Sequence, residues 1–251
     1  MTDMTAPASP IAQNSTSTLS LPGATWLLAK LNLKLLFRGN LWWILAACGA
    51  LPVLLARISE SRHAAETAVA SAITLLSIFT PLLVAGSVGE EVEKKTYAYL
   101  WSRPIPRTSF ILGKLLAYAP FLFLVFFLSV LASTSMAASR GGGATELAPL
   151  VAGGAVAAFM LSVACALVAT ITPKHATGFS LFYLLFVDNV IGGIPTSIRY
   201  LSLQFQARTV IGIHEDSIVP IATSLPTSLT VGAVMLVVFW YFIVRRSQKL
   251  E

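Results

Sequence analysis

The stretch GKLLAYAPFLFLVFFLSVLASTS, residues 113–135, decides the class of fold. It holds a single charged residue, Lys114, near its start, and nearly all the others are apolar or small. A helix that crosses a bilayer needs roughly 20 mostly apolar residues. The stretch therefore predicts a membrane-spanning helix.

The composition of the whole chain agrees with this prediction. Of its 251 residues, 56% are hydrophobic and 11% are charged, whereas a soluble domain carries about 25% charged residues. Six apolar stretches predict an all-α membrane protein, and they leave loops too short for a catalytic domain of normal size. We expect the spans at residues 41–56, 69–89, 113–135, 149–171, 178–194 and 220–244.

The basic residues predict the orientation of the chain. The net charge is +6, and the lysines and arginines lie beside apolar stretches rather than in one basic tract, which favours membrane topology over nucleic-acid binding. With the N-terminus inside, twelve of the 17 basic residues fall on the cytoplasmic side. We therefore expect a multi-pass protein of the cytoplasmic (inner) membrane with both termini in the cytoplasm. Residues 1–22 are expected to be a disordered cytoplasmic lead-in, and residues 23–251 the six-span domain.

A basic, apolar segment precedes the first predicted span. Its three cations recur every four residues on one helical face, while Trp26 and several leucines occupy the other faces. This pattern predicts an amphipathic helix in the membrane plane, although a helix that begins the first span with snorkelling lysines is the alternative. The expected membrane-interface residues are Trp26, Lys30, Lys34, Arg38 and the aromatic anchors Trp42 and Trp43.

The segment between the last two predicted spans, residues 195–219, is semi-apolar but holds several charged residues. If it crossed the membrane, Arg245 and Arg246 would be exported, against the positive-inside rule. We therefore expect it on the outer side, as an interfacial or re-entrant element packed against protein.

Asp188 is a carboxylate within a predicted span, followed by Asn189. An ionisable residue in a span is a functional candidate because burial of its charge is costly, so we expect both residues to belong to a pathway or gate. The alternative is structural. The glycines and proline of residues 192–195 break the helix, and Asp188 could accept hydrogen bonds from freed amides or pair with Arg199 or Arg208.

The loop between the second and third predicted spans, residues 89–114, holds eight charged residues. Residues 90–102 have the pattern of a short amphipathic helix, and Pro104 and Pro106 then end it. Such a helix and turn could receive force from a cytoplasmic partner, or it could be a solvated loop whose charges hold the helix ends at the headgroups.

The order of residues in this loop resembles the signature of the permease subunits of ABC-type-2 exporters, with Lys95 where that family usually has glycine. The matching residues are Glu91, Thr96, Leu100, the stretch SRPIPR at 102–107, and the pair Gly113-Lys114. The expected layout, with an in-plane helix, six spans and an outer re-entrant segment, is similar to that of the same family.

The resemblance implies the membrane subunit of an ATP-driven exporter, whose loop is the coupling helix that docks into separate ATPase subunits. It also implies a second copy or a related permease chain. ATP and Mg would then be held by the ATPase partner, and this chain would be no enzyme and bind no cofactor itself. The implied docking residues are Glu90, Glu91, Lys94, Arg103 and Arg107.

The absence of several motifs agrees with an ATPase in a separate subunit. The sequence has no GxxxxGK[ST] phosphate loop, no HExxH and no GxSxG, and Cys48 and Cys165 fall in apolar stretches, so we expect no metal site. Few polar groups lie in the predicted spans, which favours an amphiphilic substrate. The alternative function is a non-transporting membrane scaffold or immunity-type protein with the same fold.

Overall fold

Helices make up all the regular structure of the residues that the computed structural model describes, which are 20–38, 41–58, 64–93, 107–139, 147–194, 196–212 and 225–247. Two of the helices are long: α6 spans Arg107–Ser139 and α7 spans Leu147–Ile171. The other α-helices are α1 (Leu21–Arg38), α2 (Leu41–Ile58), α3 (Ala64–Thr80), α4 (Gly86–Glu93), α8 (Ala176–Phe182), α9 (Asp188–Gly193), α10 (Leu203–Ile211) and α11 (Leu225–Ser247).

Short π and 3₁₀ segments join several of these helices. The π-helical turn η1 (Pro81–Ala85) joins α3 to α4, and a second one, η3 (Tyr183–Val187), joins α8 to α9. The 3₁₀ turns are η2 (Pro173–His175), which precedes α8, and η4 (Ser197–Leu201), which precedes α10. Pro81 begins the first π turn because proline lacks the N–H that a regular helix would use there.

Five helical stretches are long and apolar enough to cross a membrane, which confirms a multi-pass membrane protein. They are Thr67–Glu93, Thr108–Met136, Ala148–Ile171, Pro173–Gly193 and Pro226–Arg246, and they match five of the six predicted spans. The remaining prediction, residues 41–56, coincides with α2. In α2 the apolar stretch whose side chains are described, Gly49–Ile58, is shorter than a span, so the count of six remains a prediction.

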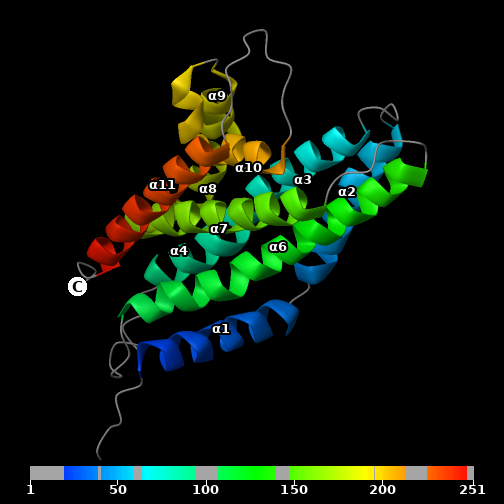
Figure 1. The fold of residues 1–251 in the computed structure, drawn as a ribbon. Coiled ribbons are helices and arrows are strands. Elements are labelled where there is room, and N and C mark those ends of the chain that lie inside the picture. The colour runs from blue at the N-terminus through cyan, green and yellow to red at the C-terminus, as the bar shows by residue number, and fades with distance from the viewer. Residues whose placement is uncertain are drawn as a thin grey trace, which may run out of the picture.

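The long helices run from one end of the molecule to the other (Figure 1). At the end that we call the α4–α6 end, α4 ends, α6 begins, and α7 turns through η2 into α8. The C-terminal end of α11 lies at this end too. Helices α2 and α6 end, and α3 and α7 begin, toward the opposite end, so successive long helices alternate in direction.

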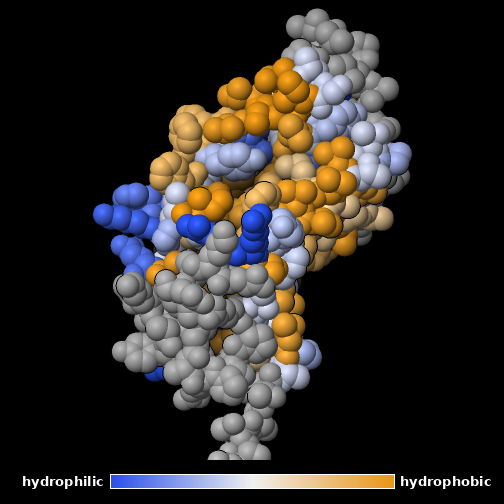
Figure 2. Space-filling view, turned by 90° about the vertical axis from the view of Figure 1, so that its left-hand side faces the viewer, coloured by the Kyte–Doolittle hydropathy of each residue, from blue (hydrophilic) through white to orange (hydrophobic). Residues whose placement is uncertain are grey.

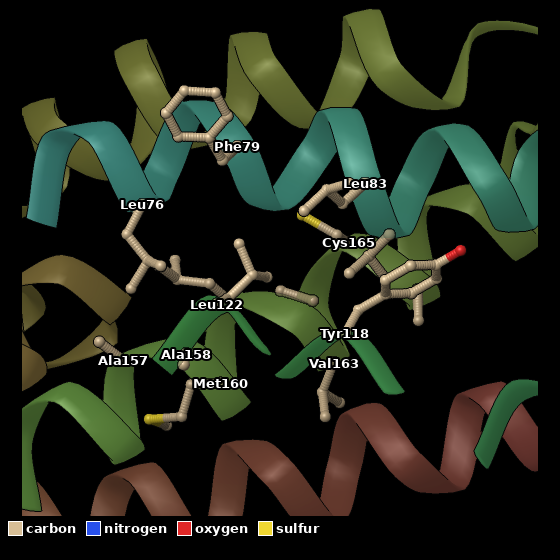
Figure 3. Packing of buried hydrophobic residues seen from close by; sticks show 14 of the residues in the cluster. Leu76, Phe79, Leu83, Tyr118, Leu122, Ala157, Ala158, Met160, Val163 and Cys165 are labelled. Carbon is tan, nitrogen blue, oxygen red and sulfur yellow. The ribbon is translucent and has the colours of Figure 1, made fainter. Parts of the chain in front are cut away.

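Helices α3, α6 and α7 form most of the core (Figure 3). Leu76 of α3 points toward Leu122 of α6, and Ala157 and Ala158 of α7 are fully buried beside them. In a bilayer the association of helices depends on close van der Waals packing rather than on water exclusion. The small residues of α7 allow that packing.

Helix α1 lies along the N-terminal part of α6 (Figure 1). Leu28 packs over Gly113, and further along both helices the ring of Phe37 lies 5.8 Å from that of Phe121, so the two helices run in the same direction. The predicted helix is therefore confirmed, and it begins at Leu21, just before the expected boundary at residue 23. Its in-plane orientation remains a prediction.

We expect Gly113→Ala to lower the free energy of unfolding by about 2 kcal/mol. A Cβ at Gly113 would lie 2.7 Å from the Cβ of Leu28 and 3.2 Å from the carbonyl oxygen of Thr25, so α1 must move away. The measurement is denaturation by sodium dodecyl sulfate followed by circular dichroism. The control is Gly178→Ala in α8, where a Cβ meets no atom within 4 Å, and it should gain up to about 1 kcal/mol. A loss of the same size at both glycines would contradict the α1 contact.

The predicted loop at residues 89–114 is shorter in the structure than expected. Residues up to Glu93 continue the helix of the second span, and α6 already begins at Arg107. Lys114, which we expected among the loop charges, is therefore a buried helical residue. The remaining residues, 94–106, lie outside the described part of the chain, and so does most of the predicted amphipathic helix.

Candidate functional site

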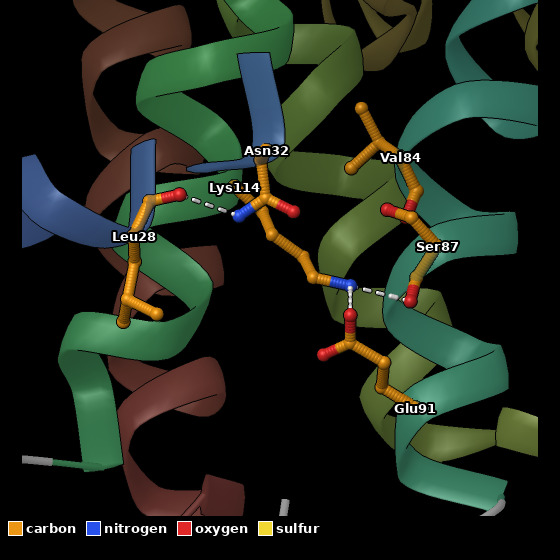
Figure 4. Close-up of polar contacts among 6 residues, drawn as sticks. All are labelled: Leu28, Asn32, Val84, Ser87, Glu91 and Lys114. Atoms are coloured by element: carbon orange, nitrogen blue, oxygen red, sulfur yellow. Dashed lines mark hydrogen bonds and ion pairs between the residues drawn. The ribbon is translucent and has the colours of Figure 1, made fainter. Parts of the chain in front are cut away.

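A buried ion pair joins the two helices that flank residues 94–106. The side chain of Lys114 in α6 is 1% exposed, and its Nζ lies 3.0 Å from Glu91 Oε1 at the end of α4 (Figure 4). The same ammonium donates a hydrogen bond to the carbonyl oxygen of Ser87 and lies 4.9 Å from the centre of the Phe110 ring. Lys114 thus has an anionic, a carbonyl and an aromatic partner.

The position of the pair follows from how the helices end. Ser87 and Glu91 are four residues apart, so they lie on one face of α4, and this face is turned toward α6 (Figure 4). A buried ammonium is costly unless it is paired and hydrogen-bonded. Separating α4 from α6 would leave Lys114 without both partners, so the pair holds the two helices together.

A groove opens beside α4 at the same end of the molecule. It has a volume of about 310 Å³ and lies between α4 and the turn from α7 to α8. Gly89 allows the close approach of these elements, since a Cβ there would lie 2.6 Å from the Cβ of Ala176. The groove is lined by Glu90 and Glu93 on one side and by Lys174 and His175 on the other.

The surface at the α4–α6 end is polar (Figure 2). Hydrophilic side chains gather there below a largely apolar surface. The exposed charged residues that the structure places at this end include Glu90, Glu93, Lys174, Arg245 and Arg246. Both signs of charge therefore occur at this end.

The predicted docking residues are only partly described. Glu90 is exposed on α4, and Glu91 is half-buried against Lys114. Lys94 and Arg103 lie outside the described residues. Arg107 is the first residue of α6, but its side chain is not among those described. The structure therefore brings Glu90 and Glu91 to one end of the molecule, and docking itself remains a prediction.

The expected membrane-interface residues of α1 are exposed. Trp26 is 67% exposed, and Lys30, Lys34 and Arg38 are exposed on the side opposite to the face that packs on α6. Leucines and Phe37 on the flanks of the basic stripe are exposed too. Trp42 and Trp43 lie in α2, and their side chains are outside the described set.

Asp188 is buried and fully hydrogen-bonded. It begins α9, and its carboxylate lies against the start of α10. Oδ1 accepts from the backbone N–H of Leu203 at 2.8 Å, and Oδ2 accepts from the backbone N–H of Gln204 at 3.0 Å and from Ser202 Oγ at 3.1 Å. The carboxylate thus binds donors at the N-terminus of a helix, where negative charge is favoured.

The structural alternative for Asp188 predicts hydrogen bonds from backbone amides to its carboxylate, and the structure contains such bonds. The amides belong to Leu203 and Gln204, however, and not to residues 192–195 at the end of α9. Asn189 is exposed and donates a hydrogen bond to the carbonyl oxygen of Leu185. A pathway or gate role for either residue remains a prediction.

The described part of the segment at 195–219 is packed against protein. It folds as η4 and α10, and α10 contacts α7, α9 and α11. With nine residues α10 is about 14 Å long, too short to cross a bilayer. Gln204 and Gln206 are buried in it, at 2% and 1% exposure. The sequence analysis did not single out these two residues.

No protein-family model and no curated protein matches this sequence. The resemblance to the exporter permeases therefore depends on the residues of the loop and on the helical layout.

Proposed function

We propose that this chain is the membrane subunit of an ATP-driven exporter of the ABC type. Its first span would be α2, both termini would lie in the cytoplasm, and η4 with α10 would form a re-entrant element on the outer side. Separate ATPase subunits would bind ATP and Mg, and two copies or two related chains would enclose the transport path in the inner membrane.

The observation that carries this proposal is the ion pair between Glu91 and Lys114. We define residues 94–106 as the coupling segment. A movement of the ATPase that displaces this segment must also displace the spans on both of its sides. Because the pair fixes α4 to α6, a push on the coupling segment would move both helices as one body. Rigid-body movement of this kind is a common basis of switching between two states.

The exposed faces of the last two spans support assembly with a second chain. In Pro173–Gly193 and Pro226–Arg246 only 22% and 17% of the apolar window is buried, against 50% or more in the three other spans. These faces carry large apolar side chains, including Phe182, Phe186 and Val237. They would contact lipid, the second permease chain, or both.

We expect Arg103→Glu together with Arg107→Glu to abolish co-purification with an ATPase encoded beside this chain. The two reversals put negative charge where the docking surface needs positive charge, and unfavourable charge pairs at an interface cost several kcal/mol. The measurement is the yield of ATPase captured with the tagged full-length chain. The matched control is Arg245→Glu with Arg246→Glu, which reverses two charges at the same end on α11 and should keep the ATPase bound. Undiminished capture by the first pair would contradict the docking assignment.

A further inference from the structure

Helices α1 and α2 run along α6 one after the other (Figure 1). Helix α1 meets α6 first at Gly113 and then at Phe121. In α2 the carbonyl oxygen of Gly49 accepts a hydrogen bond from Ser129 Oγ at 2.9 Å. The three contacts occur in the same order along both segments of the chain. Helix α1 therefore lies beside the first part of α6, and α2 lies beside the second part.

The contact at Gly113 lies where the apolar stretch of α6 begins. From Leu28, which packs over Gly113, to Phe37, which contacts Phe121, α1 rises by about 14 Å. The hydrocarbon core of a bilayer is roughly 30 Å thick. A helix that follows a spanning helix over this distance reaches nearly to the middle of the bilayer. This course differs from the in-plane orientation that the sequence predicts.

The basic stripe of α1, which consists of Lys30, Lys34 and Arg38, covers the same distance. Successive members are four residues apart, so their backbones are separated by about 6 Å along the helix. All three side chains are exposed, on the side turned away from α6. Within the described residues none of them takes part in an ion pair. Arg38, in the last turn of α1, is the deepest of the three.

Exposed cations at this depth require an anion. A charge that faces acyl chains is costly, so ionisable residues within a membrane pair with a partner or line a polar path. In the described part of the chain, the carboxylates of the candidate spans are Asp188 and the glutamates of α4. Asp188 is hydrogen-bonded to the start of α10, and the glutamates lie at the α4–α6 end rather than at the depth of Arg38. A second copy of the chain would bring the same carboxylates, so we look for the anion in a ligand.

The side chains beside the basic stripe are apolar and exposed. Leu31 and Leu35 lie on one flank and are 51% and 58% exposed, and Phe37 on the other flank is 57% exposed. A ligand that contacts the stripe therefore meets cations together with an apolar surface. An amphiphile with an anionic headgroup fits both.

We propose that the basic stripe of α1 is a ladder of binding sites for the phosphate headgroup of an anionic amphiphile. The headgroup enters at Lys30, near the membrane surface, and passes to Lys34 and then to Arg38. The apolar chain stays in contact with Leu31 and Leu35. Arg38 holds the phosphate most tightly, because a guanidinium group binds phosphate with two parallel hydrogen bonds. That this amphiphile is the exported molecule rests on the proposed function, whereas its binding to the isolated chain does not.

The first test measures the depth of α1. Leu27 and Leu35 are 59% and 58% exposed and lie eight residues apart on this helix. Leu27→Cys and Leu35→Cys are each made in a full-length chain that also carries Cys48→Ala and Cys165→Ala, and a nitroxide spin label is attached. In liposomes the accessibility of the label to oxygen and to a nickel chelate gives its depth. We expect position 35 to lie about 10 Å deeper than position 27, and equal depths would overturn the proposal.

The second test measures the binding of phosphatidic acid. The full-length chain in a nonionic detergent is titrated with dioctanoyl phosphatidic acid, and the bound lipid is counted by native mass spectrometry. Lys34→Gln together with Arg38→Gln should weaken binding at least about tenfold. The matched control is Arg245→Gln with Arg246→Gln, which also removes two exposed charges near the end of an α-helix and should leave the affinity nearly unchanged.

Three results of this titration would contradict the ladder. Equal losses in the two double variants would mean that the overall charge of the chain attracts the lipid. Dioctanoyl phosphatidylcholine that binds as tightly as the phosphatidic acid would exclude recognition of an anionic headgroup, and inorganic phosphate that binds as tightly would exclude an amphiphile. All four substituted side chains are exposed, so we expect the variants to fold. A failure here is distinct from a failure of the proposed function, which would appear as lost ATPase capture.

Discussion

Glu91→Gln is expected to lower the free energy of unfolding by about 2 kcal/mol. The variant keeps the size of the side chain but leaves the ammonium of Lys114 without an anion, while that ammonium is 1% exposed. Removing one partner of a fully buried pair costs roughly 3–5 kcal/mol. The smaller value is expected because Glu91 is 38% exposed, so water can partly replace its charge.

The same denaturation experiment separates the cost of an unpaired charge from a loss of packing. Lys114→Met removes the charge and keeps most of the volume, so it should change the free energy of unfolding by less than about 1 kcal/mol. Adding Lys114→Met to Glu91→Gln should then recover most of the lost stability. An unchanged stability of Glu91→Gln would show that the pair does not hold α4 to α6.

The spans could be predicted because each is a local pattern. Three of the predicted stretches, residues 41–56, 149–171 and 178–194, agree within two residues at both ends with the helices α2, α7 and α8 to α9. Apolar runs of this length have few alternatives to a helix in a bilayer. The predicted ends beside the charged loop deviate further from the observed helix ends. The helices there continue past their apolar parts to the polar residues Glu93 and Arg107.

The partners of the charged residues could not be predicted in this way. Lys114 and Ser87 are 27 positions apart, and their contact depends on the packing of α3 and η1, which α4 continues, against α6. Asp188 could be singled out from the sequence, because a carboxylate is rare in an apolar span. Its partners, Leu203 and Gln204, could not be predicted, because they depend on how α10 folds back onto α9.

The burial of the two glutamines of α10 could not be predicted from the sequence. Gln204 and Gln206 occur in a segment that also holds arginines, and a segment of this polarity does not indicate buried amides. Only the packing of α10 against α7 and α11 shows that both are inside.

Asp188→Asn is expected to lower the free energy of unfolding by about 3 kcal/mol, because hydrogen bonds to a charged group contribute roughly 1.5–3 kcal/mol each. The carboxylate accepts from three donors, at least one on each oxygen. An asparagine has one acceptor oxygen, so in either orientation its NH₂ group faces the donor of Leu203 or those of Ser202 and Gln204. The measurement is again denaturation followed by circular dichroism.

The control for this variant is Asn189→Ala on the neighbouring exposed position, which should change stability by no more than about 0.5 kcal/mol. Export and ATPase capture, measured on the same variants, separate the two roles of Asp188. A destabilised Asp188→Asn chain that still captures the ATPase and loses export in proportion to its folded fraction would assign the carboxylate to holding α10. Loss of export at unchanged stability would instead assign it to the pathway, because the helix would then hold its place without the charge that transport requires.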